Sequence, residues 1–334
     1  MAWGSHCEFV DPESYQSAIH PAKVDILVTA RGAYRAALTR VEFPRVLLQH
    51  GRESLARVAT TAADKKRPPF IFLANPRQAP ITQNGRDLAY GEIVVVGLGA
   101  TRHHRTVGAC DWAGISLTQD ELASASRALL GREVTDRSFT HIVRPSTPPM
   151  ARLLRLQQVA EQLAQRKDNV LVQLESARAL EAGLLHALIM CLADGERIEP
   201  SAGGRRHAEI IARFEETLAA NYDRPLHLPE ICAAIDAPER TLRVSCMEHL
   251  GMGPIQFLWL RRMHIARRAL IQADKGTASV TEIATASGFW ELGRFAVEYR
   301  VLFGETPSAT LRRPAREIRD AGSNPFVLAD AEYA

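Results

Sequence analysis

The chain has 334 residues, a length that corresponds to about two domains. Hydrophobic residues make up 46% and charged residues 24%, as in soluble globular proteins, and no apolar run reaches the roughly 18 residues of a membrane helix. The net charge of +3 permits nucleic-acid binding without arguing for it, so a DNA-binding function has to be inferred from motifs.

The five cysteines are scattered along the chain, and no pair has the spacing of metal ligands. Sparse cysteines in an odd number are typical of a reducing compartment rather than of a disulfide framework. The first eleven residues lack a basic start followed by an apolar stretch, so no secretory signal is predicted. We therefore expect a cytoplasmic protein with no membrane association.

Short apolar and β-branched runs dominate the first part of the chain. Examples are residues 24–29, 70–73 and 93–96, and turn residues such as Asn84-Gly85 separate them. Regularly spaced short strands predict a sandwich or barrel-like β-domain. We expect its aromatic residues to fill the core for the most part, although some could line a pocket.

Two amphipathic helices are predicted next, over residues 150–167 and 170–193, joined by a short polar turn at 167–169. This helical hairpin has two interpretations: it packs on its own β-domain, or it forms a dimer interface. We favour the dimer interface, because linking two copies of a binding unit raises the affinity for its partner.

Glycine, proline and serine are frequent in residues 194–206, which predicts a flexible linker. The linker separates two domains, and the end of the chain is expected to be loosely held. The predicted divisions are an N-terminal domain at 1–193, with a β-rich part at 20–145 and a helical part at 150–193, the linker at 194–206, a C-terminal domain at 207–316, and a tail at 317–334.

Helix signals are dense after residue 207. Pro238 and Gly251 have the positions expected at the start and just past the end of a helix. Ser279 and Glu282 have the spacing of a capping box, and Gly288 can adopt a positive φ in a turn. The predicted helices cover residues 208–222, 228–235, 238–250, 254–273, 280–287, 290–303 and 306–313.

A short helix, a tight turn and a longer helix form the helix-turn-helix pattern, in which the longer helix enters the major groove. The pattern occurs twice here, with helix 254–273 between the two units. A helix of roughly 20 residues is about 30 Å long, close to the roughly 34 Å between successive major grooves. Helices 238–250 and 290–303 are therefore predicted to read successive major grooves.

These motifs resemble the AraC/XylS family of bacterial transcription regulators over about residues 208–313. The second unit carries the strongest match, in the sequence Ile-Ala-Thr-Ala-Ser-Gly-Phe at 283–289 and Phe-Gly-Glu-Thr-Pro-Ser at 303–308. Further matches lie at 228–232, 240–242, Gly251, 260–262, 266–267, 294–295 and 299–300.

The resemblance implies an α+β protein: a β-rich, jelly-roll-like N-terminal domain with a helical hairpin, followed by an all-α domain with two helix-turn-helix units joined by a long helix. It implies a dimeric transcription activator that binds promoter DNA, responds to a small-molecule effector and works with RNA polymerase. It implies no enzymatic activity, and we expect no catalytic residue, cofactor or metal. An effector-independent DNA-binding regulator remains the alternative.

The candidates for DNA contact lie on the two longer helices, at positions that the resemblance places toward the DNA. Arginine can hold guanine O6 and N7, so Arg294 is the first candidate for base readout. The full set is Arg240, Thr241, Arg243 and Val244 on the first helix and Trp290, Leu292, Gly293, Arg294, Val297 and Arg300 on the second. Arg300, with Arg312 and Arg313, is expected to contact phosphate. Leu242, Phe295 and Tyr299 are expected in the core.

The first unit departs from the family pattern at three positions. Pro238 replaces a serine, Val244 replaces an arginine, and Cys246 replaces a core phenylalanine. The first recognition helix is therefore expected either to make fewer base contacts or to read a thymine methyl group.

Two chemical alternatives concern the N-terminal domain. His50, His103 and His104 could hold a metal in a jelly-roll enzyme, but the adjacent pair would point to opposite faces of a strand. Cys110 could act as a reactive thiol, which requires a lowered pKa. A small buried cysteine is the preferred interpretation.

Overall fold

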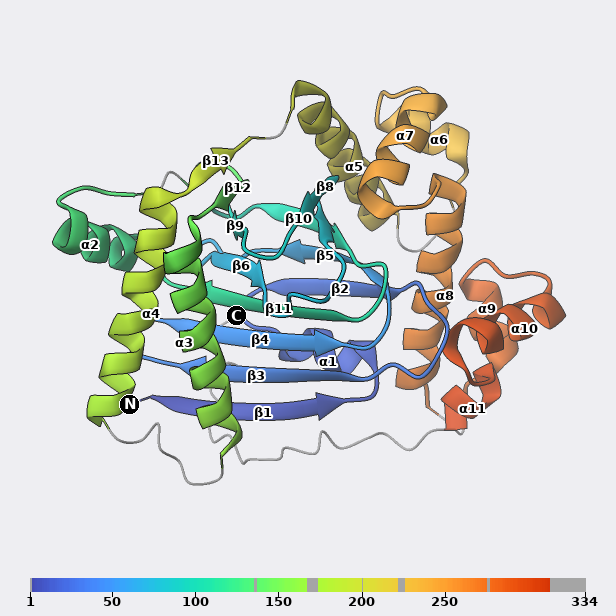
Figure 1. Cartoon of the computed structure of the whole chain (residues 1–334). Coiled ribbons are helices and arrows are strands. Elements are labelled where there is room, and N and C mark those ends of the chain that lie inside the picture. The colour runs from blue at the N-terminus through green and yellow to red at the C-terminus, as the bar shows by residue number, and fades with distance from the viewer. Residues whose placement is uncertain are drawn as a thin grey trace.

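A computed structural model describes residues 2–134, 137–166, 174–199, 201–221, 226–274 and 277–312. Two antiparallel sheets form the N-terminal part, and helices α5 to α11 lie at one side of them (Figure 1). The predicted α+β architecture is thus confirmed.

The large sheet has eight strands in the order β1-β3-β4-β11-β6-β9-β12-β13, and the small sheet has five in the order β2-β5-β10-β7-β8. The large sheet contains β1 (Trp3–Phe9), β3 (Ala36–Glu42), β4 (Leu47–Glu53), β6 (Pro69–Leu73), β9 (Ile93–Val95), β11 (Cys110–Ser116), β12 (His141–Arg144) and β13 (Glu196–Ile198). The small sheet contains β2 (Lys23–Val28), β5 (Arg57–Ala62), β7 (Ile81–Gln83), β8 (Arg86–Leu88) and β10 (Thr101–Arg105). The β-rich part begins at Trp3 rather than at residue 20, because β1 is held by its pairing with β3 and not by an apolar pattern of its own.

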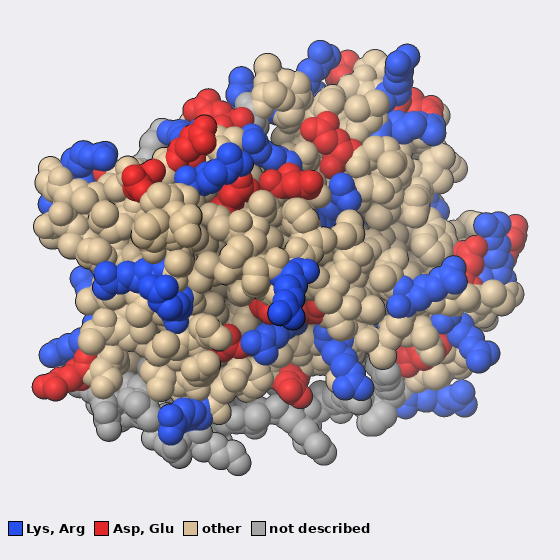
Figure 2. All heavy atoms as spheres, in the orientation of Figure 1, with Lys and Arg blue, Asp and Glu red and all other residues tan. Residues whose placement is uncertain are grey.

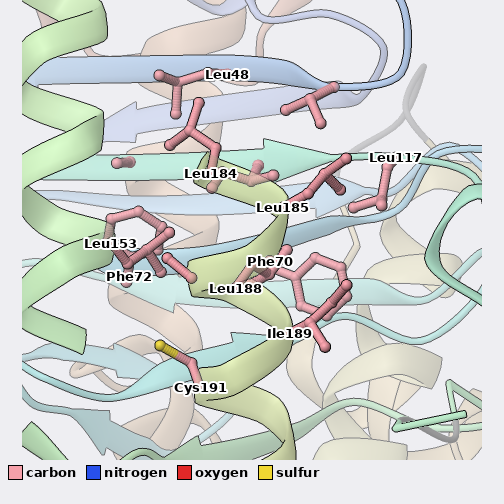
Figure 3. Close-up of a cluster of buried hydrophobic side chains, with 14 of the residues drawn as sticks. Leu48, Phe70, Phe72, Leu117, Leu153, Leu184, Leu185, Leu188, Ile189 and Cys191 are labelled. Atoms are coloured by element: carbon pink, nitrogen blue, oxygen red, sulfur yellow. The ribbon is translucent and has the colours of Figure 1, made fainter. Parts of the chain in front are cut away.

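Helices α3 (Thr147–Gln165) and α4 (Leu174–Asp194) cover one face of the large sheet (Figure 1). Leu184, Leu188 and Ile189 of α4 are fully buried against Phe70 and Phe72 of β6 (Figure 3). Fully burying side chains of this kind contributes roughly 1.5–3 kcal/mol each. The hairpin thus packs on its own domain, and its predicted connecting turn at 167–169 lies outside the described residues.

By length and composition alone, Glu175–Asp194 is apolar enough to cross a membrane. The same leucines are buried in the core of this domain, however, so we interpret the segment as a core helix. Two further helices, α1 (Pro12–Ala18) and α2 (Gln119–Leu130), flank the sheets and were not predicted.

The segment predicted as a flexible linker carries regular structure. Strand β13 pairs with β12 at the edge of the large sheet, with Ile198 opposite Ile142. Helix α5 (Ala202–Ala220) begins six residues before its predicted start, and the Ser201 hydroxyl caps it by accepting from the Gly204 amide at 3.0 Å. Edge pairing and capping therefore order a sequence whose composition predicted a linker.

The C-terminal helices follow the predicted order. They are α6 (Leu228–Ala234), α7 (Glu239–Leu250), α8 (Pro254–Gln272), α9 (Val280–Ala286), α10 (Leu292–Phe303) and α11 (Pro307–Arg312). Pro238 is the N-cap of α7 rather than its first residue, and α10 begins at Leu292 rather than at Trp290. Arg313 and the predicted tail at 317–334 lie outside the described residues.

Candidate nucleic-acid interface

The two helix-turn-helix units repeat the same local geometry. Their turns contain Asp236 with φ +48° and Gly288 with φ +82°, each just after a short helix. Aspartate tolerates this left-handed conformation better than most residues, which explains why the first turn needs no glycine. Both longer helices then end on a left-handed glycine, Gly251 after α7 and Gly304 after α10.

A capping box fixes the start of the second unit. The Ser279 hydroxyl accepts from the Glu282 amide at 3.1 Å, and the Glu282 carboxylate accepts from the Ser279 amide at 3.2 Å. This reciprocal arrangement satisfies two amides that a helix end otherwise leaves unpaired. The capping box predicted from the spacing is confirmed.

Each recognition helix has one buried face. Leu242 and Cys246 of α7, and Phe295 and Tyr299 of α10, are at most 2% exposed and belong to one core with α5, α6, α8 and α9. The prediction that these four residues are core is confirmed. The helix faces opposite them are consequently directed to solvent.

The candidates for DNA contact lie on those outer faces or directly before α10. Thr241 is half-buried, and the other nine are exposed. Several of them are large apolar side chains, with Trp290 76% and Val297 64% exposed. Exposed apolar residues gathered on one surface indicate contact with a partner.

The side chain of Arg294 is exposed, but a carboxylate on the same helix holds it in place. Its Nε donates to Glu298 Oε1 at 2.8 Å, and Glu298 Oε2 accepts from Trp259 Nε1 of α8 at 2.9 Å. The hydrogen bond from Arg294 lowers the pKa of Glu298, so this carboxylate is charged at neutral pH. Arg243 is held in the same way by Glu239 at 2.6 Å, whereas Arg240 has no ion-pair partner among the described residues.

A groove joins the two recognition helices. Arg243 of α7 lies at one side, Arg294 and Glu298 of α10 at the other, and Trp259 with the first turn of α8 forms the floor.

Lys and Arg side chains alternate with Asp and Glu on the face of the molecule in Figure 2, without one continuous basic patch. The charges on this face therefore give no argument for DNA binding by themselves, in line with the net charge of +3.

Helix α8 connects the two units and also anchors them. Arg267 is buried, pairs with Glu305 at 3.5 Å and lies over the ring of Phe303 at 4.7 Å. Arg261 donates to the Leu218 carbonyl at 3.1 Å. These two arginines therefore make contacts within the C-terminal domain.

The outer face of the small sheet packs directly on the C-terminal helices. Arg268 of α8 pairs with Asp25 of β2, and His264 Nε2 donates to the Val28 carbonyl at 3.1 Å. Glu215 of α5 accepts from Thr60 Oγ1 at 2.9 Å and lies 3.2 Å from His103 Nδ1. Leu27 and Val58 of this sheet share the hydrophobic core of the helices. No local sequence pattern predicted this docking.

The inner face of the small sheet lines a cavity of about 60 Å³ between the two sheets. Arg57 Nε and Nη2 hold the Glu53 carboxylate at 2.8 and 2.9 Å, and Arg57 Nη1 donates to His104 Nδ1 at 2.7 Å. Burial and the positive charge of Arg57 lower the pKa of His104 well below its ordinary value, so this ring is neutral. Trp112 is an aromatic residue of the β-domain that lines this cavity.

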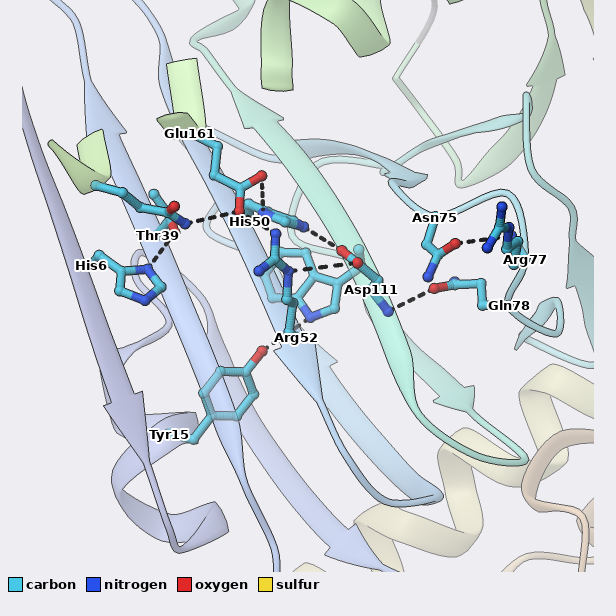
Figure 4. A network of polar contacts seen from close by, with 12 residues as sticks. His6, Tyr15, Thr39, His50, Arg52, Asn75, Arg77, Gln78, Asp111 and Glu161 are labelled. Atoms are coloured by element: carbon cyan, nitrogen blue, oxygen red, sulfur yellow. Dashed lines mark hydrogen bonds and ion pairs between the residues drawn. The ribbon is translucent and has the colours of Figure 1, made fainter. Parts of the chain in front are cut away.

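The histidines considered as metal ligands are dispersed. His103 and His104 point to opposite faces of β10, as predicted, and His50 lies on β4 between Asp111 of β11 and Glu161 of α3 (Figure 4). Burial by itself lowers the pKa of His50, but hydrogen bonds to these two carboxylates outweigh it and raise the pKa. Within the described ranges, no group of three or more His, Cys, Asp and Glu residues could hold a metal ion.

Cys110 is buried, and its burial raises the pKa of the thiol to about 12. A reactive thiol requires the opposite shift. The structure therefore favours the interpretation of Cys110 as a small core residue.

Two short-helix, long-helix units with exposed outer faces, held by one connecting helix, define a tandem helix-turn-helix DNA-binding domain. A family described as a helix-turn-helix domain matches residues 231–313. The probable thc operon regulatory protein of Rhodococcus erythropolis is 37% identical over 103 residues, which are 31% of each chain. The XylDLEGF operon transcriptional activator of Pseudomonas putida is 32% identical over 118 residues, or 35% of this chain and 36% of that protein.

The match thus spans about a third of the length of these curated relatives. Among solved structures, a probable AraC family transcriptional regulator from Rhodopseudomonas palustris CGA009 is 34% identical, covering 32% of this chain and 98% of that one, with a TM-score of 0.29. The AraC-like transcriptional activator CuxR is 15% identical, covering 85% of this chain and 100% of that one, with a TM-score of 0.41. In its C-terminal domain, the chain belongs to the AraC/XylS family of helix-turn-helix transcription regulators.

Proposed function

We propose that this chain is a ligand-responsive regulator that binds promoter DNA sequence-specifically and activates transcription. The observation that carries the proposal is the pair of exposed recognition faces on α7 and α10, each opposite a fully buried face of the same core. The curated relatives named above include an operon activator and an operon regulatory protein, which supports the proposed direction of control.

The two recognition helices have different side chains for reading bases. Arg294 presents a planar guanidinium that fits guanine, and Arg240 presents a second one without an internal partner. Val244 and Val297 are exposed apolar residues of the size that contacts a thymine methyl group. Arg300 and Arg312 are exposed farther along and are assigned to phosphate.

The small sheet supplies the route for a ligand response. One of its faces lines the internal cavity and the other packs on α5, α7 and α8. A ligand that alters this sheet would therefore change how the DNA-binding domain is held, which is the differential contact that an allosteric response requires. We further propose that the chain dimerises through the outer side of α3 and α4, that it contacts RNA polymerase, and that it is located in the cytoplasm.

The test is a selection of genomic fragments by the purified full chain at a fixed, moderate salt concentration, read by sequencing. We expect enrichment of a motif with two blocks about one helical turn apart. Recovery of a single block would show that the first recognition helix does not read bases. The absence of any enriched motif, with and without cell extract as a source of effectors, would overturn the proposal.

A further inference from the structure

A guanidinium group without a carboxylate partner lies inside the sandwich. Arg102 of β10 is 3% exposed and lines the cavity between the sheets. Its Nη1 donates to Gln83 Oε1 at 3.1 Å, and no ion-pair partner is found for it in the described parts of the chain. Burial and the nearby Arg57 lower its pKa to about 10, so Arg102 remains a cation at neutral pH.

The other charged groups around the cavity have hydrogen-bond or ion-pair partners in the protein. Glu53 is bound on both oxygens by Arg57, and Tyr34 also donates to it at 3.3 Å. At the rim, Asp64 accepts from the backbone amide of Arg67 at 2.9 Å, and the Arg67 side chain lies 3.6 Å from Glu121. Arg102 is therefore the cation of this lining that has no carboxylate partner in the described parts of the chain.

The groups next to Arg102 that lack a protein partner are hydrogen-bond donors. Arg102 Nε and Gln83 Nε2 are both buried, and neither has an acceptor among the described protein atoms. A water molecule can accept from an N–H group, but it cannot neutralise a buried charge, whose transfer from water is costly. A set of donors around an unpaired cation is suited to an oxyanion, and carboxylates pair with arginine in this way.

The size and the remaining walls of the cavity restrict the anion further. A volume of about 60 Å³ corresponds to about four to six water-sized positions. The rest of the wall is largely apolar. The apolar side chains that line it are Val24, Ile26, Ile71, Ile81, Leu88 and Trp112.

We propose that the cavity binds a small monocarboxylate, with the carboxylate group on Arg102 and Gln83 and a short hydrocarbon part against the apolar wall. The identification of this ligand as the effector rests on the proposed function, because only a regulator would convert its binding into a change of DNA affinity. The binding itself depends only on the cavity.

The experiment uses the purified full chain and isothermal titration calorimetry with propionate, and with propionamide as its neutral match. We expect propionate to bind and propionamide to bind at least tenfold more weakly. Arg102→Met, which keeps most of the side-chain volume, should weaken propionate binding at least tenfold. Arg31→Met, a change of an exposed arginine in the loop after β2, should bind propionate like the wild type.

Thermal unfolding of the same proteins separates a binding role from a structural one. Removing an unpaired buried cation should leave the Tm of the unliganded protein unchanged or raise it, and propionate should raise the Tm of the wild type and of Arg31→Met but not that of Arg102→Met. If Arg102→Met does not fold, Gln83→Leu replaces it, with an expected several-fold loss of propionate affinity. No binding of acetate, propionate or butyrate, equal binding of propionamide, or undiminished binding by the variants would overturn the inference. Nitrate binding as strongly as propionate would overturn the role of the apolar wall.

DNA binding is measured on the same samples with and without propionate. Sequence-selective DNA binding without any carboxylate binding would overturn this inference alone. Carboxylate binding without selective DNA binding would overturn the proposed regulator and leave the cavity assignment standing.

Discussion

Arg102 and His103 are consecutive residues of β10 whose side chains leave the small sheet on opposite faces. Arg102 enters the cavity between the sheets, whereas His103 lies 3.2 Å from Glu215 on α5 of the DNA-binding domain. A single peptide unit therefore separates the proposed ligand site from a contact with the DNA-binding domain. Successive side chains of a strand point to opposite faces, and here this alternation places the proposed ligand site next to the contact with the DNA-binding domain.

Arg294→Ala should weaken specific DNA binding by about 1–3 kcal/mol and relax the preference at one base position. Binding to the selected motif and to variants of it at each position, at one salt concentration, measures both effects. Arg31→Ala, at an exposed arginine outside the C-terminal helices, serves as the control. Uniform weakening on all sequences with a shallower salt dependence would instead assign Arg294 to a phosphate.

Phe295→Ala should destabilise the C-terminal domain by about 3–5 kcal/mol, because it leaves a cavity under α10. Val297→Ala changes an exposed position of the same helix and should alter the free energy of unfolding by no more than about 0.5 kcal/mol. Urea unfolding of the full chain, followed by circular dichroism, compares the two variants. Similar losses for both would contradict the assignment of the two helix faces.

The domain contact at His264 should make stability depend on pH. Burial, the largest effect, lowers the pKa of His264; the hydrogen bond to the Val28 carbonyl opposes it, Arg268 and Arg267 add to it, and the resulting pKa is about 3. The unfolded chain, with an ordinary pKa of about 6.5, then binds more protons than the folded chain between these values. Stability is therefore complete above about pH 6.5 and should fall as the pH drops toward 3.

This dependence can be attributed to one side chain by substitution. His264→Gln should flatten the fall in unfolding free energy between pH 6.5 and 4, with a change of up to about 1.4 kcal/mol per pH unit removed. Burial also lowers the pKa of His249, to about 4, so part of the fall should remain. His227→Asn, at an exposed position, provides the comparison. An unchanged slope in His264→Gln would mean that this contact is not linked to pH.

The proposed dimer depends on the outer side of the α3–α4 hairpin. Val159 of α3 is 44% exposed although it is apolar, and a charge there should disfavour association. We expect the full chain to sediment as a dimer and Val159→Glu to sediment as a monomer. Ser124→Glu, on exposed α2, makes a charge change elsewhere and should leave the dimer intact. A wild type that remains monomeric at high concentration would contradict the dimer.

The DNA-binding domain could be predicted almost element by element, because its signals are local. Helix stops at Gly251 and Gly304 and the capping box at Ser279 depend on neighbouring residues only. Strand β10, with the sequence Thr-Arg-His-His-Arg, could not be predicted, since its strand conformation comes from pairing with β5 and β7. The pair of Arg268 and Asp25 joins residues 243 positions apart, a distance over which sequence patterns carry no signal.

Some features were present in the sequence and were nevertheless missed. Thr118 and Glu121 form a capping box at the start of α2, with Gly131 at its end, so this helix could have been predicted. The position of Arg102 is different in kind. A charged residue in a polar strand is predicted to be exposed, and only the packing of the two sheets shows that Arg102 is buried.

In the proposed mode of DNA binding, the hydrogen bond between Arg294 and Glu298 makes base recognition an exchange of partners. A base that offers two acceptors can replace the carboxylate, while Trp259 still donates to Glu298 and keeps it in place. A base without such acceptors cannot replace the carboxylate, so the arginine stays on Glu298 and makes no base contact. Discrimination then depends on the Arg294–Glu298 pair as well as on the base contact, and Glu298→Gln, which weakens that pair and removes a negative charge, should bind non-cognate DNA more tightly while discriminating less.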